Sequence, residues 1–419
     1  MIRLLFDNKS SVNIPHCPGI DTYNSIFHIL LYNGWPVELV EPDEVTNDVD
    51  YFYTVKPQEF LLNMNISQKT MIDYIPENSL NLIKNHQRVK FLVYFPWEGF
   101  DLSLYDYTVV RFFNHCVEHH NIPADKIYFV YGDRNIEHIL DTLDVKFKIP
   151  YKNILGVNIF EYISYIDSTK NTLVPTDHLR SLKGYNKPKR FLFKNGNARP
   201  QRAYLLGAFH HLDLLKHFHY SWLNHYNVEL NDRYLNSFFR SFSPDDTQYK
   251  EYIDSFKKLN ENAPIVLDKN PDAMTSRENQ ILQSDKLTID SYVTLVSETV
   301  VDMNDRGCLF TSEKTYQPIY QLHPFISVGC PGTLEYLREC GYETFPELFD
   351  ETYDKMENKA DRLNAIVKEV DKFTKIPTDK LNDIYYSEYI LDKLVHNRLK
   401  FNQRQGRSEF FRFINWISK

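Results

Sequence analysis

The chain has 419 residues, of which 42% are hydrophobic and 25% are charged, and its formal net charge is -8. These values are typical of a globular protein that is long enough for two domains of ordinary size. The negative charge argues against broad, non-specific nucleic-acid binding, although it allows a local basic patch. The many Tyr, Phe, Asn and Lys residues are consistent with AT-rich coding in a virus, phage or bacterium.

The five cysteines lie at positions 17, 116, 308, 330 and 340 and form no CxxC pair. Such an odd, scattered set predicts reduced thiols and a cytoplasmic location, which is the host cytoplasm if the protein is viral. The start, MIRLLFDNKSS, becomes charged too early for a secretory signal and is expected to form a strand. No apolar run approaches the roughly 18 residues of a membrane-spanning helix, so no membrane span is predicted.

Strand-like and helix-like segments alternate through the first 180 residues. The expected helices lie near Tyr23–Asn33 and over 106–120, and the expected strands are 1–7, 35–41, 89–96 and 126–132. This alternation with short loops predicts a parallel sheet covered by helices. Ligands of such sheets bind at the carboxyl ends of the strands.

A second α/β pattern begins near residue 187. Its expected helix is 201–215, and its expected strands are 190–195, 263–268, 291–299 and 324–329. The sequence therefore predicts two Rossmann-like domains, 1–180 and 187–381, that face a cleft and are joined by a polar linker at 167–186. A helical tail, 382–419, follows, and a return to the first domain is one option for its course.

A basic stretch follows the first strand of the second domain. Between Leu179 and Leu212 there are eight basic residues and no acidic residue. In the sequence NGNARPQR, Asn195 permits a tight turn, and Arg199 and Arg202 fall in the loop and the first helical turn. A helix N-terminus with nearby guanidinium groups suits phosphate oxygens. The alternative is a solvated basic linker before an ordinary capped helix.

A second group of polar residues follows the strand at 291–299. Ser297 and Glu298 end that strand, and Glu313 and Lys314 begin a helix for which Thr311 or Ser312 is the expected cap. Capping explains an acid in the first turn, but a cation there is mildly unfavourable. Lys314 therefore predicts an anionic ligand, and the neighbouring acid could accept the hydroxyl groups of a ribose.

The segment from this pair onward, SEKTYQPIYQLHPFISVGCPGTLEYLRECGYETF, resembles the carboxyl-terminal half of GT-B glycosyltransferases. It is most similar to the α1,3-fucosyltransferase-like group and its uncharacterised bacterial and viral relatives, and the similarity spans roughly Arg190–Asp354. The resemblance implies that Glu313 lies near the ribose and Lys314 near the diphosphate of the donor. Thr299 stands where that group usually has Asn, so the identity of the sugar does not carry over.

The resemblance implies a metal-independent glycosyltransferase that moves a sugar from a nucleotide-diphosphate donor to an acceptor hydroxyl and needs no cofactor. The Pro-Gly turn of the same segment places Gly332 and Thr333 at the head of a helix, where they either face the donor or form a plain capped turn. The predicted donor-binding residues are Asn195, Arg199, Arg202, Ser297, Glu298, Thr311, Glu313, Lys314, Gly332 and Thr333.

An inverting transferase also needs a group that accepts the proton of the acceptor hydroxyl. Glu98, in the loop after the strand at 89–96, is the first choice for this base. Asp133 is the second and Asp21 the third. Each of these acids has an alternative role as a loop cap or a solvated side chain.

A metal site is not predicted. His115, Cys116, His119 and His120 have helical spacing, but no second set of ligands accompanies them. No DxD motif with apolar flanks occurs, so lysine and arginine are expected to neutralise the diphosphate instead.

Two other functions stay open. The basic tail HNRLKFNQRQGRSEFFRF is compatible with a phage DNA-modifying glycosyltransferase that acts on hydroxymethylated bases, whose binding would weaken with salt. The other is a non-catalytic protein that binds a nucleotide-sugar or glycan.

Overall fold

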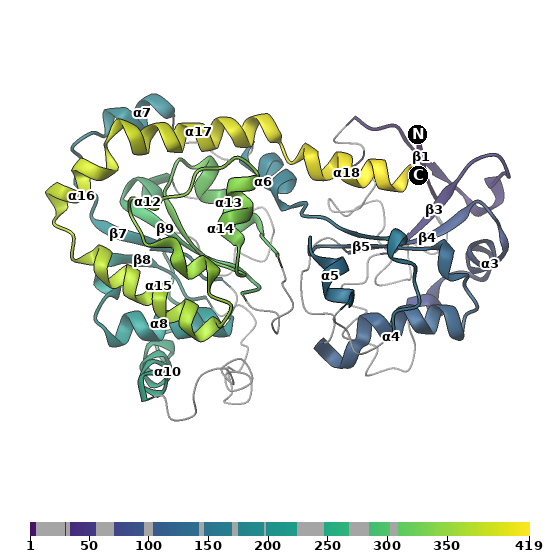
Figure 1. The fold of residues 1–419 in the computed structure, drawn as a ribbon, viewed down its shortest axis with the longest axis horizontal. Helices are drawn as coiled ribbons and strands as arrows, with labels where there is room; N and C mark the ends of the chain where they lie inside the picture. Colours follow the sequence, from purple (N-terminus) through teal and green to yellow (C-terminus); the bar gives the residue numbers. More distant parts are fainter. Residues whose placement is uncertain are drawn as a thin grey trace. The chain divides into compact units, whose positions relative to one another are not determined.

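The computed structural model describes residues 1–5, 30, 34–55, 71–95, 104–141, 146–169, 175–196, 198–223, 247–267, 285–301 and 309–419. The chain forms two compact units (Figure 1). The first contains Met1–Ile159 and Glu409–Lys419, and the second contains Phe160–Asp305 and Leu309–Ser408. The segment 167–186, which the sequence suggested as a linker, thus belongs to the second unit.

The first unit is an α/β unit. Its sheet consists of parallel strands in the order β2-β1-β3-β4-β5-β6. All residues of β4 except Lys90 are buried, as expected for a parallel strand that is covered on both faces. Its elements are β1 (Ile2–Leu5), β2 (Val37–Val40), η1 (Pro42–Glu44), β3 (Tyr51–Val55), η2 (Met71–Tyr74), α3 (Glu77–Asn85), β4 (Val89–Phe95), α4 (Leu104–Glu118), η3 (Ala124–Lys126), β5 (Ile127–Tyr131), α5 (Ile136–Asp141), η4 (Tyr151–Asn153), β6 (Ile154–Gly156) and α18 (Arg407–Ile417).

The last helix of the chain, α18, packs onto the first sheet. The ring of Phe413 lies 5.7 Å from that of Tyr94 on β4. Farther along the helix, the Trp416 indole donates a hydrogen bond of 2.8 Å to the Lys152 carbonyl. These contacts give the amphipathic end of the chain its apolar partner, so α18 is part of the core of the first unit.

The second unit is also α/β, with parallel strands in the order β10-β9-β7-β8. Its elements are α6 (Phe160–Ser168), α7 (Thr176–Ser181), β7 (Lys189–Phe193), α8 (Pro200–His211), η5 (Leu215–His217), β8 (Phe218–Tyr220), α10 (Thr247–Asn260), α12 (Asp285–Ile289), β9 (Ser291–Ser297), α13 (Glu313–Tyr320), β10 (Phe325–Val328), α14 (Thr333–Glu339), η8 (Glu351–Lys355), α15 (Lys359–Thr374), α16 (Thr378–Tyr385) and α17 (Glu388–Arg404).

Helices cover both faces of the second sheet. The ring of Phe191 on β7 lies 5.2 Å from that of Phe373 on α15, on one face. Tyr292 on β9 points to the opposite face, where its ring lies 5.3 Å from that of Tyr385 on α16. The expected strand at 263–268 does not form, since Ile265 makes only an isolated bridge with Trp222.

The strand order of the second sheet creates a switch point between β7 and β9. β7 is the first strand of the unit in the sequence; β8 lies on one side of it and β9 on the other. The loops that leave the carboxyl ends of β7 and β9 therefore diverge, and ligands of doubly wound sheets bind at this position. The predicted donor residues Asn195, Arg199, Ser297 and Glu298 all follow or end these two strands.

Candidate functional site

Three helices begin at the carboxyl edge of the second sheet. α8 follows β7, α13 follows β9 and α14 follows β10. The N-terminus of a helix carries partial positive charge and unpaired amide groups, so each start could receive an anion. The three helix starts differ in which side chains of the protein already lie at them.

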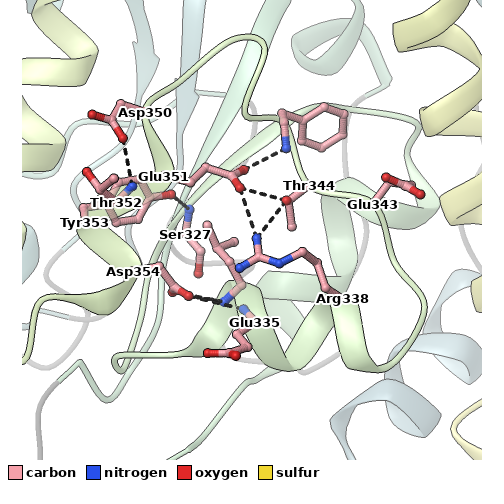
Figure 2. A network of polar contacts seen from close by, with 12 residues as sticks. Ser327, Glu335, Arg338, Glu343, Thr344, Asp350, Glu351, Thr352, Tyr353 and Asp354 are labelled. Carbon is pink, nitrogen blue, oxygen red and sulfur yellow. Dashed lines mark hydrogen bonds and ion pairs between the residues drawn. The ribbon is translucent and has the colours of Figure 1, made fainter.

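The start of α14 is occupied by a carboxylate of the protein. Asp354 accepts hydrogen bonds from the amides of Leu334, at 3.0 Å and 3.1 Å, and Glu335, at 3.2 Å (Figure 2). Gly332 forms the left-handed N-cap of the helix, and the Thr333 side chain donates to the Cys330 carbonyl. Asp354 therefore fills the anion position at this start, and the assignment of Gly332 and Thr333 as donor-binding residues stays a prediction.

The residues that follow α14 form a second closed network. Glu351 accepts from the Phe345 amide at 2.7 Å, the Thr344 hydroxyl at 2.8 Å and the Arg338 guanidinium at 3.1 Å (Figure 2). Burial raises the pKa of Glu351 in spite of these donors. The GYETF end of the motif thus holds the chain around η8 and does not form a ligand site.

The start of α13 is held by Glu298. Its carboxylate accepts from the Ser312 amide at 3.0 Å, from the Ser312 hydroxyl and from the Thr315 hydroxyl at 2.6 Å. Ser312, rather than Thr311, is the N-cap, since its side chain accepts from the Lys314 amide.

Three of the predicted donor contacts at this start are enclosed by the protein. Glu298 and Thr311 are fully buried and Ser297 is 4% exposed. Protein groups surround all three side chains here, and their assignment as donor-binding residues stays a prediction. Glu298 fixes the position of α13.

The start of α8 is occupied by no acid of the described residues. Arg199 is the N-cap without a side-chain capping bond, Pro200 follows at a position that needs no amide donor, and the first turn is free of acidic residues. Arg199 is half-buried, and in the described part of the chain its side chain has no hydrogen bond or ion pair. A cation at this end opposes the helix dipole unless an anion binds beside it.

Two other residues predicted for this loop have structural roles. Arg202 is 3% exposed and donates to the Ser297 carbonyl at 2.9 Å. Asn195 is fully buried and donates to the Ser221 carbonyl at 3.2 Å, which ties the ends of β7 and β8 together. Protein groups surround both side chains in this structure, and their assignment as donor contacts stays a prediction.

One residue joins the starts of α8 and α13. Gln201, in the first turn of α8, donates to the backbone carbonyl of Glu298 at 2.8 Å. The side chain of Glu298 in turn holds Ser312 and Thr315. The sequence analysis missed Gln201, because a glutamine beside two arginines carries no distinctive signal.

Glu313 and Lys314 lie in the first turn of α13 and form an ion pair with each other. The Lys314 ammonium is 2.5 Å from Glu313 Oε1 and 3.4 Å from the Ser312 hydroxyl. Their side chains remain 34% and 31% exposed, so both are open to a ligand in the described structure. The carboxyl edge of the second sheet therefore offers Arg199, Lys314 and Glu313 around two joined helix starts.

Of the three predicted catalytic acids, Asp133 lies within the described residues. Asp133 is fully buried, and its Oδ1 accepts from the Asn135 amide at 2.8 Å before α5 begins. Its assignment as an acceptor-side base stays a prediction. Glu98 and Asp21 lie outside the described residues and stay predictions.

The histidines of α4 lie together at its carboxyl end. The rings of His119 and His120 lie 4.5 Å and 5.0 Å from that of His115, and burial lowers the pKa of His115 and His120. Within the described ranges, no three His, Cys, Asp or Glu side chains are arranged to hold a metal ion. Within the same ranges, no helix combines the length and apolar character needed to cross a membrane.

Several basic side chains of the tail are engaged inside the protein. Arg398 donates to the Tyr320 carbonyl at 2.8 Å, Arg404 pairs with Glu161 at 2.7 Å, and Arg412 donates to the Gly156 carbonyl at 2.7 Å. These arginines stabilise helices α17 and α18. They therefore do not support the interpretation of the tail as a DNA-binding surface.

Comparisons with known proteins give little similarity. No model of a known protein family matches the chain, and no curated protein matches it. Among solved structures, a trehalose-6-phosphate synthase, OtsA, matches at 12% identity over 87% of this chain and 73% of that chain. The TM-score is 0.36, a likeness too low to support an argument about fold, family or activity.

Proposed function

We propose that the protein is a GT-B glycosyltransferase that takes its sugar from a nucleotide-diphosphate donor. The observation that carries the proposal is the start of α8, where Arg199 has no partner among the described residues and the first turn has no acid. Of the three helix starts at the carboxyl edge, the other two already hold the carboxylates of Glu298 and Asp354. The sequence resemblance of the second unit to GT-B enzymes supports the same assignment.

In this proposal the diphosphate lies at the start of α8. Arg199 and the helix N-terminus would bind its oxygens, and Lys314 would approach from the start of α13. Charge builds on the diphosphate as the sugar leaves, so fixed cations there stabilise the transition state. These cations would take over the neutralising role that a divalent metal has in other transferases.

The Glu313 carboxylate would have two tasks. It holds the Lys314 ammonium at 2.5 Å, and its second oxygen could accept hydroxyl hydrogens of the ribose. The proton acceptor for the attacking hydroxyl belongs to the first unit in this proposal. Glu98 is the preferred candidate, with Asp133 and Asp21 as the others.

Calorimetric titration with nucleoside diphosphates of each base, in the presence and absence of a chelator, tests the donor site. We expect one diphosphate to bind equally well with chelator, and Arg199→Ala to weaken it by about ten- to hundredfold. Arg180→Ala is the matched control, since Arg180 is a surface arginine of the same unit that pairs with Asp392. Equal binding by Arg199→Ala and the parent would refute the site.

Turnover must be measured separately, because a binding protein would pass the first test. Release of free nucleoside diphosphate from the matching nucleotide-sugar, with cell extract as the acceptor source, reports on transfer. Binding without such release would refute the enzymatic part of the proposal and leave a non-catalytic nucleotide-sugar protein.

A further inference from the structure

A groove of about 500 Å³ lies in the first unit between η1 and α3. Three asparagines, Asn78, Asn81 and Asn85, line it from α3. Their spacing of three and four residues places them along one stripe of the helix. All three are exposed, and within the described part of the chain no hydrogen bond of their side chains is found.

Both walls of the groove are fixed by hydrogen bonds. The Lys126 ammonium caps the carboxyl end of α3 by donating to the carbonyls of Ile83 at 3.2 Å, Lys84 at 3.1 Å and His86 at 2.8 Å. On the other wall, Glu41 and Glu44 form a capping box around η1. The backbone on both walls is therefore already ordered. Binding of a ligand would cost little further backbone entropy, which favours affinity.

The lining has a distinct chemical character. A carboxamide offers both donors and an acceptor without charge, and three of them repeat along the groove. Leu82 and Pro42 add apolar surface, while Asp43 adds an acceptor and His86 completes the lining. Among the described residues, neither lysine nor arginine lines the groove, so it differs from the cationic start of α8.

We propose that this groove binds a neutral oligosaccharide. Sugar hydroxyls are donors and acceptors at once, which matches carboxamides, and the C–H faces of sugar rings match Leu82 and Pro42. A phosphate or nucleotide would meet no cation here, and Asp43 would repel it. The volume lies within the usual range of ligand pockets, about 300–1,000 Å³. The proposal does not depend on the donor site.

The test uses the full chain and three neutral probes: cellotetraose, maltotetraose and chitotetraose. Each is titrated by calorimetry up to about 10 mM, because a single shallow site gives affinities near the millimolar range. We expect at least one probe to bind. The triple substitution of Asn78, Asn81 and Asn85 by Ala should weaken that binding at least tenfold, because it removes several hydrogen bonds.

Two further variants make the result decisive. Asn402→Ala changes an exposed asparagine on α17 and should leave binding unchanged. Asn81→Lys places a longer, charged side chain in the groove and should abolish binding without any change in the core, even if the triple variant folds poorly. The proposal is overturned if no probe binds, if Asn81→Lys binds as the parent does, or if a nucleoside diphosphate displaces the sugar.

Discussion

Gln201 donates a hydrogen bond of 2.8 Å to the backbone carbonyl of Glu298. This bond connects α8, which follows β7, to the residue whose carboxylate holds the start of α13. The two helices leave neighbouring strands on either side of the switch point. A substitution that shifts the start of one helix should therefore also shift the start of the other.

The first prediction concerns Glu298. Glu298→Ala removes the acceptor of the Ser312 amide and the Thr315 hydroxyl, both of which stay buried. Because unsatisfied buried donors are costly, we expect the free energy of unfolding to fall by about 2–4 kcal/mol. Urea unfolding measures this loss. Glu335→Ala, which changes an exposed acid in the first turn of α14, is the control. If both variants unfold at the same urea concentration, Glu298 does not hold α13.

The second prediction concerns the pair at the head of α13. Lys314→Ala should weaken binding of the diphosphate donor and slow transfer about ten- to hundredfold, because a charge-assisted contact is lost. Glu313→Gln should reduce donor affinity more than the chemical step, since its proposed partner is a neutral ribose. Both variants should melt as the parent does, since the two side chains are about one-third exposed.

Donor affinity, turnover and melting temperature on the same three proteins test this prediction. If Lys314→Ala binds and turns over the donor as the parent does, Glu313 and Lys314 form only a surface ion pair and do not bind the donor. An early melt of Lys314→Ala would assign the lysine a structural role instead.

The third prediction concerns a buried ion pair between α6 and α17. Glu161 is 1% exposed in its side chain, and it accepts from Arg404 at 2.7 Å and 3.1 Å and from the Tyr342 hydroxyl at 2.5 Å. Arg404→Met leaves an uncompensated buried carboxylate, so we expect a loss of about 3–5 kcal/mol in the free energy of unfolding.

The matched double variant separates charge from packing in this pair. Glu161→Met combined with Arg404→Met removes both charges, and we expect it to recover most of the lost stability. Urea midpoints of the two single variants and the double variant complete the cycle. Strictly additive losses would show that the two side chains do not stabilise each other.

The fourth prediction is a pH dependence. His323 is 1% exposed, with Nε2 2.8 Å from the Ser291 carbonyl and Nδ1 2.6 Å from the Thr294 hydroxyl. Burial lowers the pKa of His323 from its ordinary value of 6.5 to about 3. Between these two values the unfolded chain binds more protons than the folded one. The contribution of His323 to stability is therefore complete above pH 6.5 and is lost as the pH falls toward 3.

Unfolding free energies at pH 7 and pH 5 measure this effect, which has a limiting slope of about 1.4 kcal/mol per pH unit. His323→Gln should show a shallower decline than the parent. His396→Gln, which changes a less buried histidine of the same unit, should decline as the parent does. Equal slopes for His323→Gln and the parent would contradict the prediction.

Local patterns predicted the strands well where the chain is apolar on both faces. The runs at 89–96 and 291–299 became β4 and β9, whose residues are almost all buried, as in strands that are covered on both faces. The equally apolar run at 263–268 did not, since only Ile265 finds a partner. The sequence analysis also missed β3, whose five residues follow an acidic segment.

The sequence indicated at which strand ends the candidate site lies, but not which of the side chains there are exposed. Strand ends are local features, so Asn195 and Glu298 were expected at the ends of strands, and they follow β7 and β9 in the structure. Whether a side chain faces a ligand or another helix depends on partners distant in sequence. Arg202 turns to the Ser297 carbonyl, 95 residues away along the chain, and no local signal reveals that contact.

The assignment of α18 to the first unit affects the order in which the chain can fold during synthesis. Glu409–Lys419 follow the whole second unit in the sequence, yet the Trp35 and Tyr128 rings lie 6.4 Å and 5.3 Å from Phe410 and Trp416 of that helix. The apolar surface of the first sheet is therefore covered only after the second unit has been synthesised. Since domains usually fold in order from the N-terminus, this chain exposes that surface for longer than a simple tandem of units would.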